Sequence, residues 1–155
     1  MKWLKTKEVE NIIIVGLNRS VSQKIYGTES EEIVKKIAEN YHGIGYVILF
    51  FSFVDDREIA ASIMKDSRIV EVFELIEQAW IAVFSVENLH DDSVLIRSGY
   101  FQKEEYQKLR EQGYLGDVCS RYFKENDFFE RNELYERVIG IDLKKLIIIK
   151  GYVLL

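Results

Sequence analysis

Ile12-Ile13-Ile14-Val15-Gly16 is a continuous β-branched run that ends at a glycine, and it sets the fold of this 155-residue chain. A second apolar run, Tyr46-Val47-Ile48-Leu49-Phe50-Phe51, follows about one helix later. Runs without polar alternation are typical of strands that are buried on both faces. Between them, apolar residues from Ile33 to Tyr41 recur at helical spacing. A strand, an amphipathic helix and a second strand form a βαβ unit, which predicts parallel pairing.

The same alternation of strands and helices continues to the end of the chain. It predicts an α/β fold, with a Rossmann-like and mostly parallel sheet and flanking helices, in one domain over residues 1–155. Thr28 and Glu31 form a capping box for the first helix, and Gly43 is predicted to end it in the left-handed conformation. Further helices are expected after Asp55 or Asp56, after Asp66 or Ser67, and over 102–112 up to Gly113; further strands are expected over 81–84, 118–123, 138–141 and 146–149.

Composition and charge exclude several classes of function. The chain has 21 Lys and Arg against 26 Asp and Glu, a net charge of −5, and its basic residues are scattered. Nucleic-acid binders cluster their cations on phosphates, so we expect this chain not to contact DNA directly. Its apolar runs are too short for a membrane helix, so no membrane partner is expected. A lone Cys119 cannot form an intrachain disulfide, which fits a reducing cytoplasm.

Three charged residues lie at or beside the predicted strands: Arg97 in a loop after an apolar run, Asp117 at the start of the strand 118–123, and Arg121 on one side of that strand. A parallel sheet binds its ligands at the carboxyl ends of its strands. Arg97 can clamp a phosphate or carboxylate, or can form a surface ion pair with Asp91 or Asp92. Asp117 can accept hydrogen bonds from sugar hydroxyls, or can be an ordinary turn residue. Arg121 can pair with Asp117 or a ligand, or can point into solvent.

The usual signatures of catalysis are missing from the sequence. His90 and the neighbouring acids lack metal-ligand spacing, so no metal is expected. Phosphate-binding and dinucleotide-binding glycine motifs are absent, so no cofactor is expected. Cys119 has no nearby His and is interpreted as a packed thiol rather than a nucleophile. No base with a partner is visible, and we therefore expect no enzymatic activity.

Three blocks in the second half of the chain carry a family resemblance. They are residues 91–100 (DDSVLIRSGY), 116–123 (GDVCSRYF) and 137–143 (RVIGIDL). In order and spacing they resemble the patterns DSxLxRSGY, GDICGRFF and RVIGISLEDL of the sugar-binding effector domain of SorC-type bacterial transcription regulators. Weaker similarity extends back to about Ile12, so the resemblance covers most of the chain.

The resemblance implies a fold, a ligand class and site residues. It implies a domain like the sugar-phosphate isomerases and deaminases that binds a sugar or phosphosugar without turning it over. It also implies a homo-oligomer that reaches DNA only through an attached helix-turn-helix. Arg97 matches a phosphate contact, Asp117 matches a sugar contact, and Asn18 lies in the first ligand loop. The expected ligand contacts also include Ser20, Ser85 and Arg121.

Departures from the family pattern lie in the loops and at the ends. Glycines are missing from the loops 18–22 and 85–87 and from position 120, and Glu87 in place of a glycine should narrow the pocket and repel a phosphate. No helix-turn-helix precedes Ile12, so the domain is expected to be truncated at both ends. Two alternatives stay open: an isomerase- or deaminase-like enzyme that uses Asp117 or Glu87 as a base, and an oligomerising structural remnant without a ligand.

Overall fold

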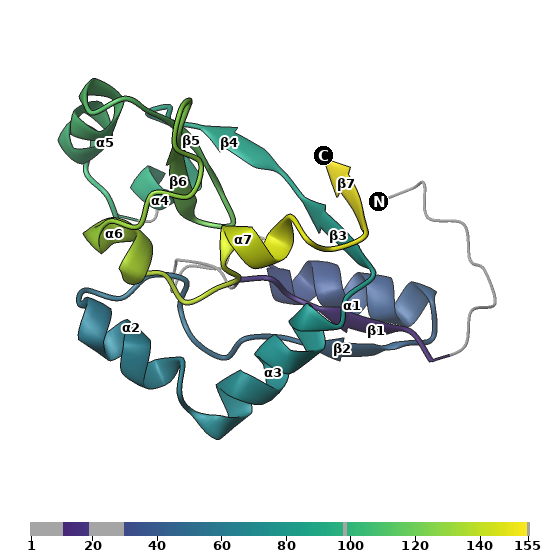
Figure 1. Cartoon of the computed structure of the whole chain (residues 1–155). Helices are drawn as coiled ribbons and strands as arrows, with labels where there is room; N and C mark the ends of the chain where they lie inside the picture. Colours follow the sequence, from purple (N-terminus) through teal and green to yellow (C-terminus); the bar gives the residue numbers. More distant parts are fainter. Residues whose placement is uncertain (1–10, 19–29, 98, 155) are drawn as a thin grey trace.

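A computed structural model describes residues 11–18, 30–97 and 99–154 of the chain (Figure 1). Strands and helices alternate along these residues as the βαβ pattern requires. In chain order they are β1 (Ile13–Val15), α1 (Ser30–Asn40), β2 (Ile44–Tyr46), α2 (Arg57–Ile63), α3 (Ser67–Glu77), β3 (Ile81–Phe84), β4 (Val86–Asn88), α4 (Val94–Arg97), α5 (Lys103–Glu111), β5 (Tyr114–Val118), β6 (Arg121–Lys124), α6 (Glu133–Glu136), α7 (Leu143–Leu146) and β7 (Gly151–Leu154).

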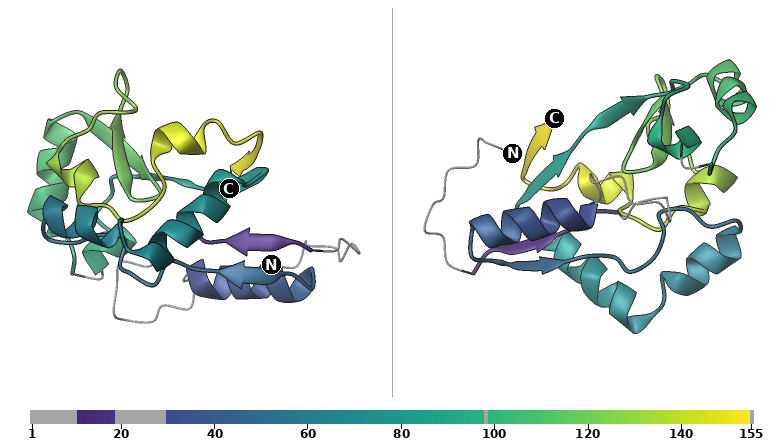
Figure 2. Two further views of the ribbon diagram at one scale, coloured as in Figure 1. Left: turned by 60° about the horizontal axis from the view of Figure 1, so that its bottom comes forward. Right: turned by 180° about the vertical axis from the view of Figure 1, so that it is seen from behind.

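The described strands form three small sheets. β1 pairs with β2 and β3 pairs with β7, both in parallel. α1 covers one side of the β1–β2 pair and α3 lies on the other side (Figure 2). The predicted α/β fold with parallel strands and flanking helices is therefore confirmed. The third sheet, β4-β5-β6, is antiparallel and was not expected.

Two apolar clusters hold these elements together. One lies among α3, β3 and α7, and the second is mainly aromatic and lies around the β5–β6 hairpin. In the aromatic cluster the buried hydroxyls of Tyr106 and Tyr122 hydrogen-bond to each other at 3.1 Å. The most deeply buried apolar residues of the first cluster are Ile48, Ala60, Ile76, Val118, Ile139, Ile141 and Leu143.

The segment 137–142 links the β1–β2 sheet to the β4-β5-β6 sheet without being a strand itself. The Ile141 N–H donates to the carbonyl of Leu17, next to β1, at 3.1 Å, and the Ile139 N–H donates to the carbonyl of Ser52 at 2.8 Å. The predicted strand over 138–141 is thus wrong, because this segment forms isolated bridges to separate partners. We call residues 137–142 the linking segment.

Three further strand predictions fail for identifiable reasons. β2 ends at Tyr46, and the apolar run after it leaves the sheet: Ile48 is fully buried, but the three residues that follow are exposed, Leu49 by 66%. The run 146–149 begins as the last turn of α7, whose first turn is capped by the Asp142 side chain. The predicted strand 118–123 contains a reversal, because β5 and β6 are joined by a two-residue turn at Cys119 and Ser120.

The helix predictions are more accurate. Asp56 and Asp66 cap α2 and α3, and Gly113 follows α5 with a φ of 86°, as expected. Gly43 does not take the left-handed conformation; His42 does, with a φ of 51°. Gly43 is instead needed for close approach, because a Cβ there would lie 2.5 Å from the Ile12 carbonyl oxygen. The capping residue proposed for α1, Thr28, lies outside the described residues.

One face of the β3–β7 pair carries exposed β-branched side chains. Ile81 is 66% exposed, and Val83 and its register partner Val153 are each about half exposed. Parallel strands usually have both faces covered, so this face is unusually apolar for a surface. Among the described residues, no helix has the length and apolar character needed to cross a membrane.

A methyl group at Gly116 is expected to push β4 and β5 apart. The backbone of Gly116 passes so close to β4 that a Cβ would lie 2.2 Å from the Glu87 carbonyl oxygen. Overpacking of this kind costs about 1–3 kcal/mol, so Gly116→Ala should lower the urea midpoint accordingly. Gly16→Ala is the matched control, because its Cβ would meet its nearest neighbour at 3.6 Å. Equal midpoints for the two variants would contradict the close approach.

Candidate functional site

Two of the predicted site residues meet in a polar cluster next to the linking segment. Asn18 follows β1 and pairs as an isolated bridge with Gly140. Its Nδ2 donates to the Ser120 Oγ at 3.2 Å. The Ser120 N–H in turn donates to the Asp117 Oδ2 at 3.0 Å. Asn18, Ser120 and Asp117 thus form a hydrogen-bonded chain between residues more than 90 positions apart, which we call the polar cluster.

The turn that carries Ser120 is held in a conformation that usually needs glycine. Cys119 and Ser120 both have positive φ, 51° and 66°, and the turn spans two residues, as in type I′ hairpins. Non-glycine residues in this region carry strain of about 1–3 kcal/mol. The two hydrogen bonds to Ser120 help to hold the turn. Burial and the Asp117 carboxylate raise the pKa of the Cys119 thiol to about 12, which fits a packed thiol.

A second carboxylate faces Asp117 from the neighbouring strand β4. In the β4–β5 register Glu87 lies directly opposite Asp117. Burial of Asp117, together with repulsion from Glu87, raises the pKa of Asp117 to about 7, although the Ser120 N–H opposes this. Like charges on directly opposed residues repel, so Glu87 adds to the effect of burial and favours the neutral form of Asp117, which is about half populated near pH 7.

Arg121, predicted to contact a ligand or to point into solvent, is instead buried, and backbone carbonyls engage its guanidinium. Only 5% of it is exposed, and its guanidinium donates to the carbonyls of Tyr135 and Ile141 at 2.6 Å and of Gly140 at 2.9 Å. A longer bond of 3.5 Å reaches the carbonyl of Val138. The guanidinium carbon also lies 4.1 Å from the centre of the Tyr135 ring. Arg121 therefore holds the linking segment against the hairpin.

The remaining predicted residues lie outside the polar cluster. Arg97 is exposed at the end of α4, which is a helix and not the strand that its apolar neighbours suggested. Of its two proposed ion-pair partners, Asp91 binds Arg110 at 3.1 Å. Ser85 is exposed between β3 and β4. Ser20 lies outside the described residues.

Sequence reasoning missed Ser120 as a member of the cluster and treated it only as a replaced glycine. A signal was present, because an Asp side chain commonly accepts a hydrogen bond from a backbone N–H a few residues later in a turn. The sequence therefore contained half of the cluster, Asp117 to Ser120. The bond from Asn18 to Ser120 depends on tertiary contact and had no local signal.

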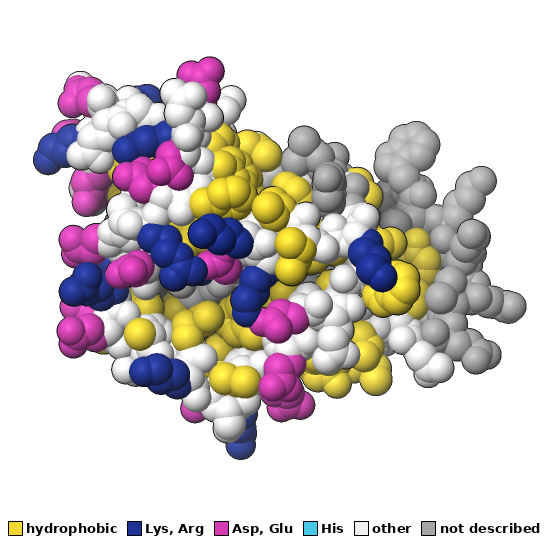
Figure 3. Space-filling view, viewed as in Figure 1, with side chains coloured by type: hydrophobic (Ala, Val, Ile, Leu, Met, Phe, Trp, Pro, Cys, Tyr) yellow, Lys and Arg dark blue, Asp and Glu magenta, His cyan; other side chains and the backbone are white. Residues whose placement is uncertain are grey.

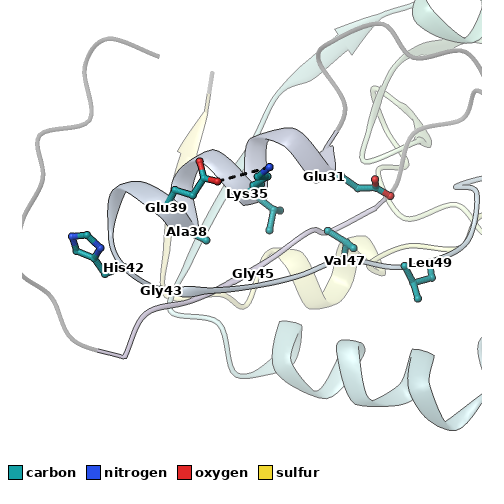
Figure 4. Close-up of a pocket in the computed structure, with 10 residues that line it drawn as sticks. Glu31, Lys35, Ala38, Glu39, His42, Gly43, Gly45, Val47 and Leu49 are labelled. Atoms are coloured by element: carbon teal, nitrogen blue, oxygen red, sulfur yellow. Dashed lines mark ion pairs between the residues drawn. The ribbon is translucent and has the colours of Figure 1, made fainter.

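The described cavities lie elsewhere on the molecule. A cavity of about 860 Å³ lies between α1 and β2, with Val34, Ala38 and Gly45 among its lining residues and the Lys35–Glu39 ion pair at its rim (Figure 4). A smaller one, of about 300 Å³, includes Tyr114 and Arg137. No group of three potential metal ligands occurs among the described residues. On the face in Figure 3, basic side chains are interspersed with carboxylates, as the sequence predicted.

Comparison with known proteins identifies a family and a fold. The family model Sugar-bind, for a sugar-binding domain, matches residues 1–154. A deoxyribonucleoside regulator of Bacillus subtilis (strain 168) is 29% identical over 143 residues, which are 92% of this chain and 45% of that protein. The chain thus spans less than half of that curated relative.

Solved structures of regulators share this fold. A DeoR family transcriptional regulator from Listeria monocytogenes superposes with a TM-score of 0.79 at 23% identity, over 92% of this chain and 56% of that one. The full-length sorbitol operon regulator SorC from Klebsiella pneumoniae gives 0.83 at 16% identity, over 96% and 48%. Together with the match of the family model over nearly the whole chain, these findings confirm the resemblance: the chain belongs to the Sugar-bind family of sugar-binding domains.

Proposed function

We propose that this chain is the effector domain of a transcription regulator and that it binds a sugar or phosphosugar at the polar cluster. The observation that carries the proposal is the hydrogen-bonded chain from Asn18 through Ser120 to Asp117. Family membership supplies the ligand class, and the regulators among the relatives supply the role. The regulator as a whole would act in the cytoplasm and contact DNA through a separate helix-turn-helix.

The polar groups of the cluster suit sugar hydroxyls. A hydroxyl both donates and accepts, an ionised carboxylate accepts only, and an amide does both. Asp117 would take a hydrogen bond from one hydroxyl, and Asn18 would bind the next. Ser85, on the rim between β3 and β4, and Arg97, on α4, stay proposed as outer contacts, with Arg97 the group suited to an anion. Arg121 is omitted because its guanidinium is engaged by backbone carbonyls.

We expect binding without turnover. An enzyme of the isomerase or deaminase class is the second candidate, and the pKa of Asp117 near 7 favours it, because a general base works best near the ambient pH. A base also needs a positioned partner. Asp117 is opposed by the carboxylate of Glu87 on β4 and by Tyr122 on β6, and its hydrogen-bond partner is the backbone N–H of Ser120. Burial raises the pKa of Tyr122, so its hydroxyl is a poor proton donor to a substrate. The relatives that match are regulators.

A homo-oligomer is part of the proposal. The exposed face of β3 and β7, with Ile81, Val83 and Val153, is suited to contact with another chain. A ligand that binds one packing arrangement better than another would shift the population of oligomers. Sedimentation with and without sugar tests this part independently of the site.

Removal of the Asn18 amide is expected to weaken sugar binding. Isothermal titration against pentoses, ketohexoses, alditols, deoxyribonucleosides and the corresponding phosphates should identify a ligand. Asn18→Ala should then lose about tenfold in affinity, the equivalent of one or two hydrogen bonds. Asn40→Ala, at the exposed end of α1, is the control and should bind as the wild type does.

The same titration separates the candidate functions. Unchanged affinity in Asn18→Ala would exclude the polar cluster as the site. Recovery of an isomerised or deaminated sugar from the calorimeter cell after the titration would favour the enzyme. Loss of affinity in Arg97→Ala, with Arg68→Ala on exposed α3 as control, would place an anionic group of the ligand near α4.

A further inference from the structure

The charges at the polar cluster favour an uncharged ligand. The side chains that oppose each other across β4 and β5 are two carboxylates, Glu87 and Asp117. Asn18 and Ser120 contribute only neutral groups. Repulsion by Glu87 is also visible in Asp117 itself, whose pKa is raised by burial and by that carboxylate, with only the Ser120 N–H opposing. Among the described residues, no cation enters this balance.

Neither arginine that the sequence suggested for an anion offers a free guanidinium to the polar cluster. Arg121 follows Ser120 directly, but its guanidinium is engaged by the carbonyls of Tyr135, Gly140 and Ile141. Arg97 belongs to α4, which packs with the aromatic cluster through the buried Leu95. Among the residues that the structure describes, a phosphate bound beside Asp117 would therefore meet carboxylates before any free cation.

Electrostatic repulsion would weaken the binding of a phosphate monoester at this place. The monoester carries a charge of about −1.5 to −2 near neutral pH. Glu87 is exposed, so its repulsion is partly screened, whereas Asp117 is half-buried and screened less. A sugar hydroxyl adds no charge and can donate to the Asp117 carboxylate.

We propose that the polar cluster takes an unphosphorylated sugar or sugar alcohol, and that Glu87 is the residue that excludes phosphate monoesters. This inference rests on the proposed function of the same site, which it narrows to one of the two ligand classes. Glu87 acts here through its charge and through its register position opposite Asp117.

The test compares each neutral ligand with its own phosphate ester. The chain is titrated near pH 7 and low salt with D-ribose, D-fructose and D-glucitol, and with ribose 5-phosphate, fructose 6-phosphate and glucitol 6-phosphate. We expect at least one neutral compound to bind about tenfold or more tightly than its ester, as expected for like charges separated by several ångströms. The ratio should shrink as salt is raised, because exposed charges are screened.

The variant Glu87→Gln tests whether Glu87 causes the preference for the neutral compound over its phosphate ester. It should raise the affinity of the ester about three- to tenfold and change that of the neutral compound by less than about twofold. Glu71→Gln, which removes the same charge from the exposed side of α3, should leave both affinities unchanged. If Gln at this position disturbs the pairing of β4 with β5, Glu87→Ser removes the same charge with a smaller side chain.

The possible outcomes separate the two levels of the proposal. Absence of binding by both neutral compounds and esters would overturn the proposed function. Binding of an ester as tight as that of its neutral parent would overturn this inference and leave the proposed function intact. A wild-type preference for the neutral compound that persists in both Glu87 variants would remove Glu87 from the explanation.

Discussion

Arg121→Met is expected to destabilise the chain by about 3–5 kcal/mol, because several buried backbone carbonyls lose their hydrogen-bond donor. The guanidinium donates to carbonyls from four residues of α6 and the linking segment. Met fills a similar volume but donates nothing, so these acceptors would stay buried without partners. Each unsatisfied buried group costs about 1–3 kcal/mol, and relaxation keeps the total below the simple sum.

Urea unfolding followed by circular dichroism measures this effect. The midpoint should fall sharply while the slope changes little, because the exposed area on unfolding stays similar. Arg131→Met is the control: Arg131 is exposed, binds Asp142, and lies 5.8 Å from the same Tyr135 ring. An exposed pair of this kind contributes up to about 1 kcal/mol. If Arg121→Met fails to fold, Arg121→Lys takes its place: it keeps the charge, and its urea midpoint should lie below that of Arg131→Met.

Asp117→Asn is expected to raise the free energy of unfolding, relative to the wild type, above neutral pH and to leave it almost unchanged in acid. The folded-state pKa of Asp117 is raised from 3.8 to about 7. The native chain therefore holds a proton that the unfolded chain releases near pH 4, so protonation favours folding. The stability that Asp117 contributes is fully present below about pH 4 and falls by up to ~1.4 kcal/mol per pH unit until about pH 7.

The comparison of two variants over pH isolates this effect. Asn cannot ionise but still offers an oxygen to the Ser120 N–H, so Asp117→Asn should gain on the order of 2–4 kcal/mol over the wild type at about pH 8. Asp92→Asn removes an equal charge from the exposed loop after β4 and serves as control. A constant difference between Asp117→Asn and the wild type from pH 4.5 to 8 would show that Asp117 is not perturbed by the fold.

Local sequence signals predicted the helices and their ends well. Asp56 and Asp66 each accept hydrogen bonds from backbone N–H groups one turn ahead, a short-range arrangement that depends on few other residues. Strand β3 was also predicted correctly, because a short apolar run that follows a helical pattern is typical of a buried strand. These elements were predictable because the stabilising partners lie within a few residues of each other in sequence.

Strands in the second half were harder to predict, because their turns lack the usual residues. The Cys119-Ser120 turn has neither Gly nor Asn, so the hairpin was predicted as one continuous strand. The apolar run around Ile148 resembles a buried strand, yet 76% of this residue is exposed after the end of α7. An apolar run alone does not distinguish a strand from the end of a helix.

The site was predictable only in part. Family resemblance pointed to Asn18 and Asp117, and the structure joins these two through Ser120. Arg121 was predicted as a surface or ligand residue because an arginine beside a strand end is usually exposed. Its true acceptors lie 14 to 20 residues further along the chain, so only the tertiary fold reveals them.

The linking segment also has a consequence for signalling. Gly140 pairs with Asn18 on one side, and its carbonyl binds Arg121 on the other. Val138, two residues earlier, pairs with Phe53 in the connection to α2. If an effector binds at Asn18 as proposed, it would contact a segment that is joined by hydrogen bonds to the β5–β6 hairpin and to the connection before α2. A change at this one segment would then reach both parts of the fold, which mutations along residues 137–142 can test as a coupling energy.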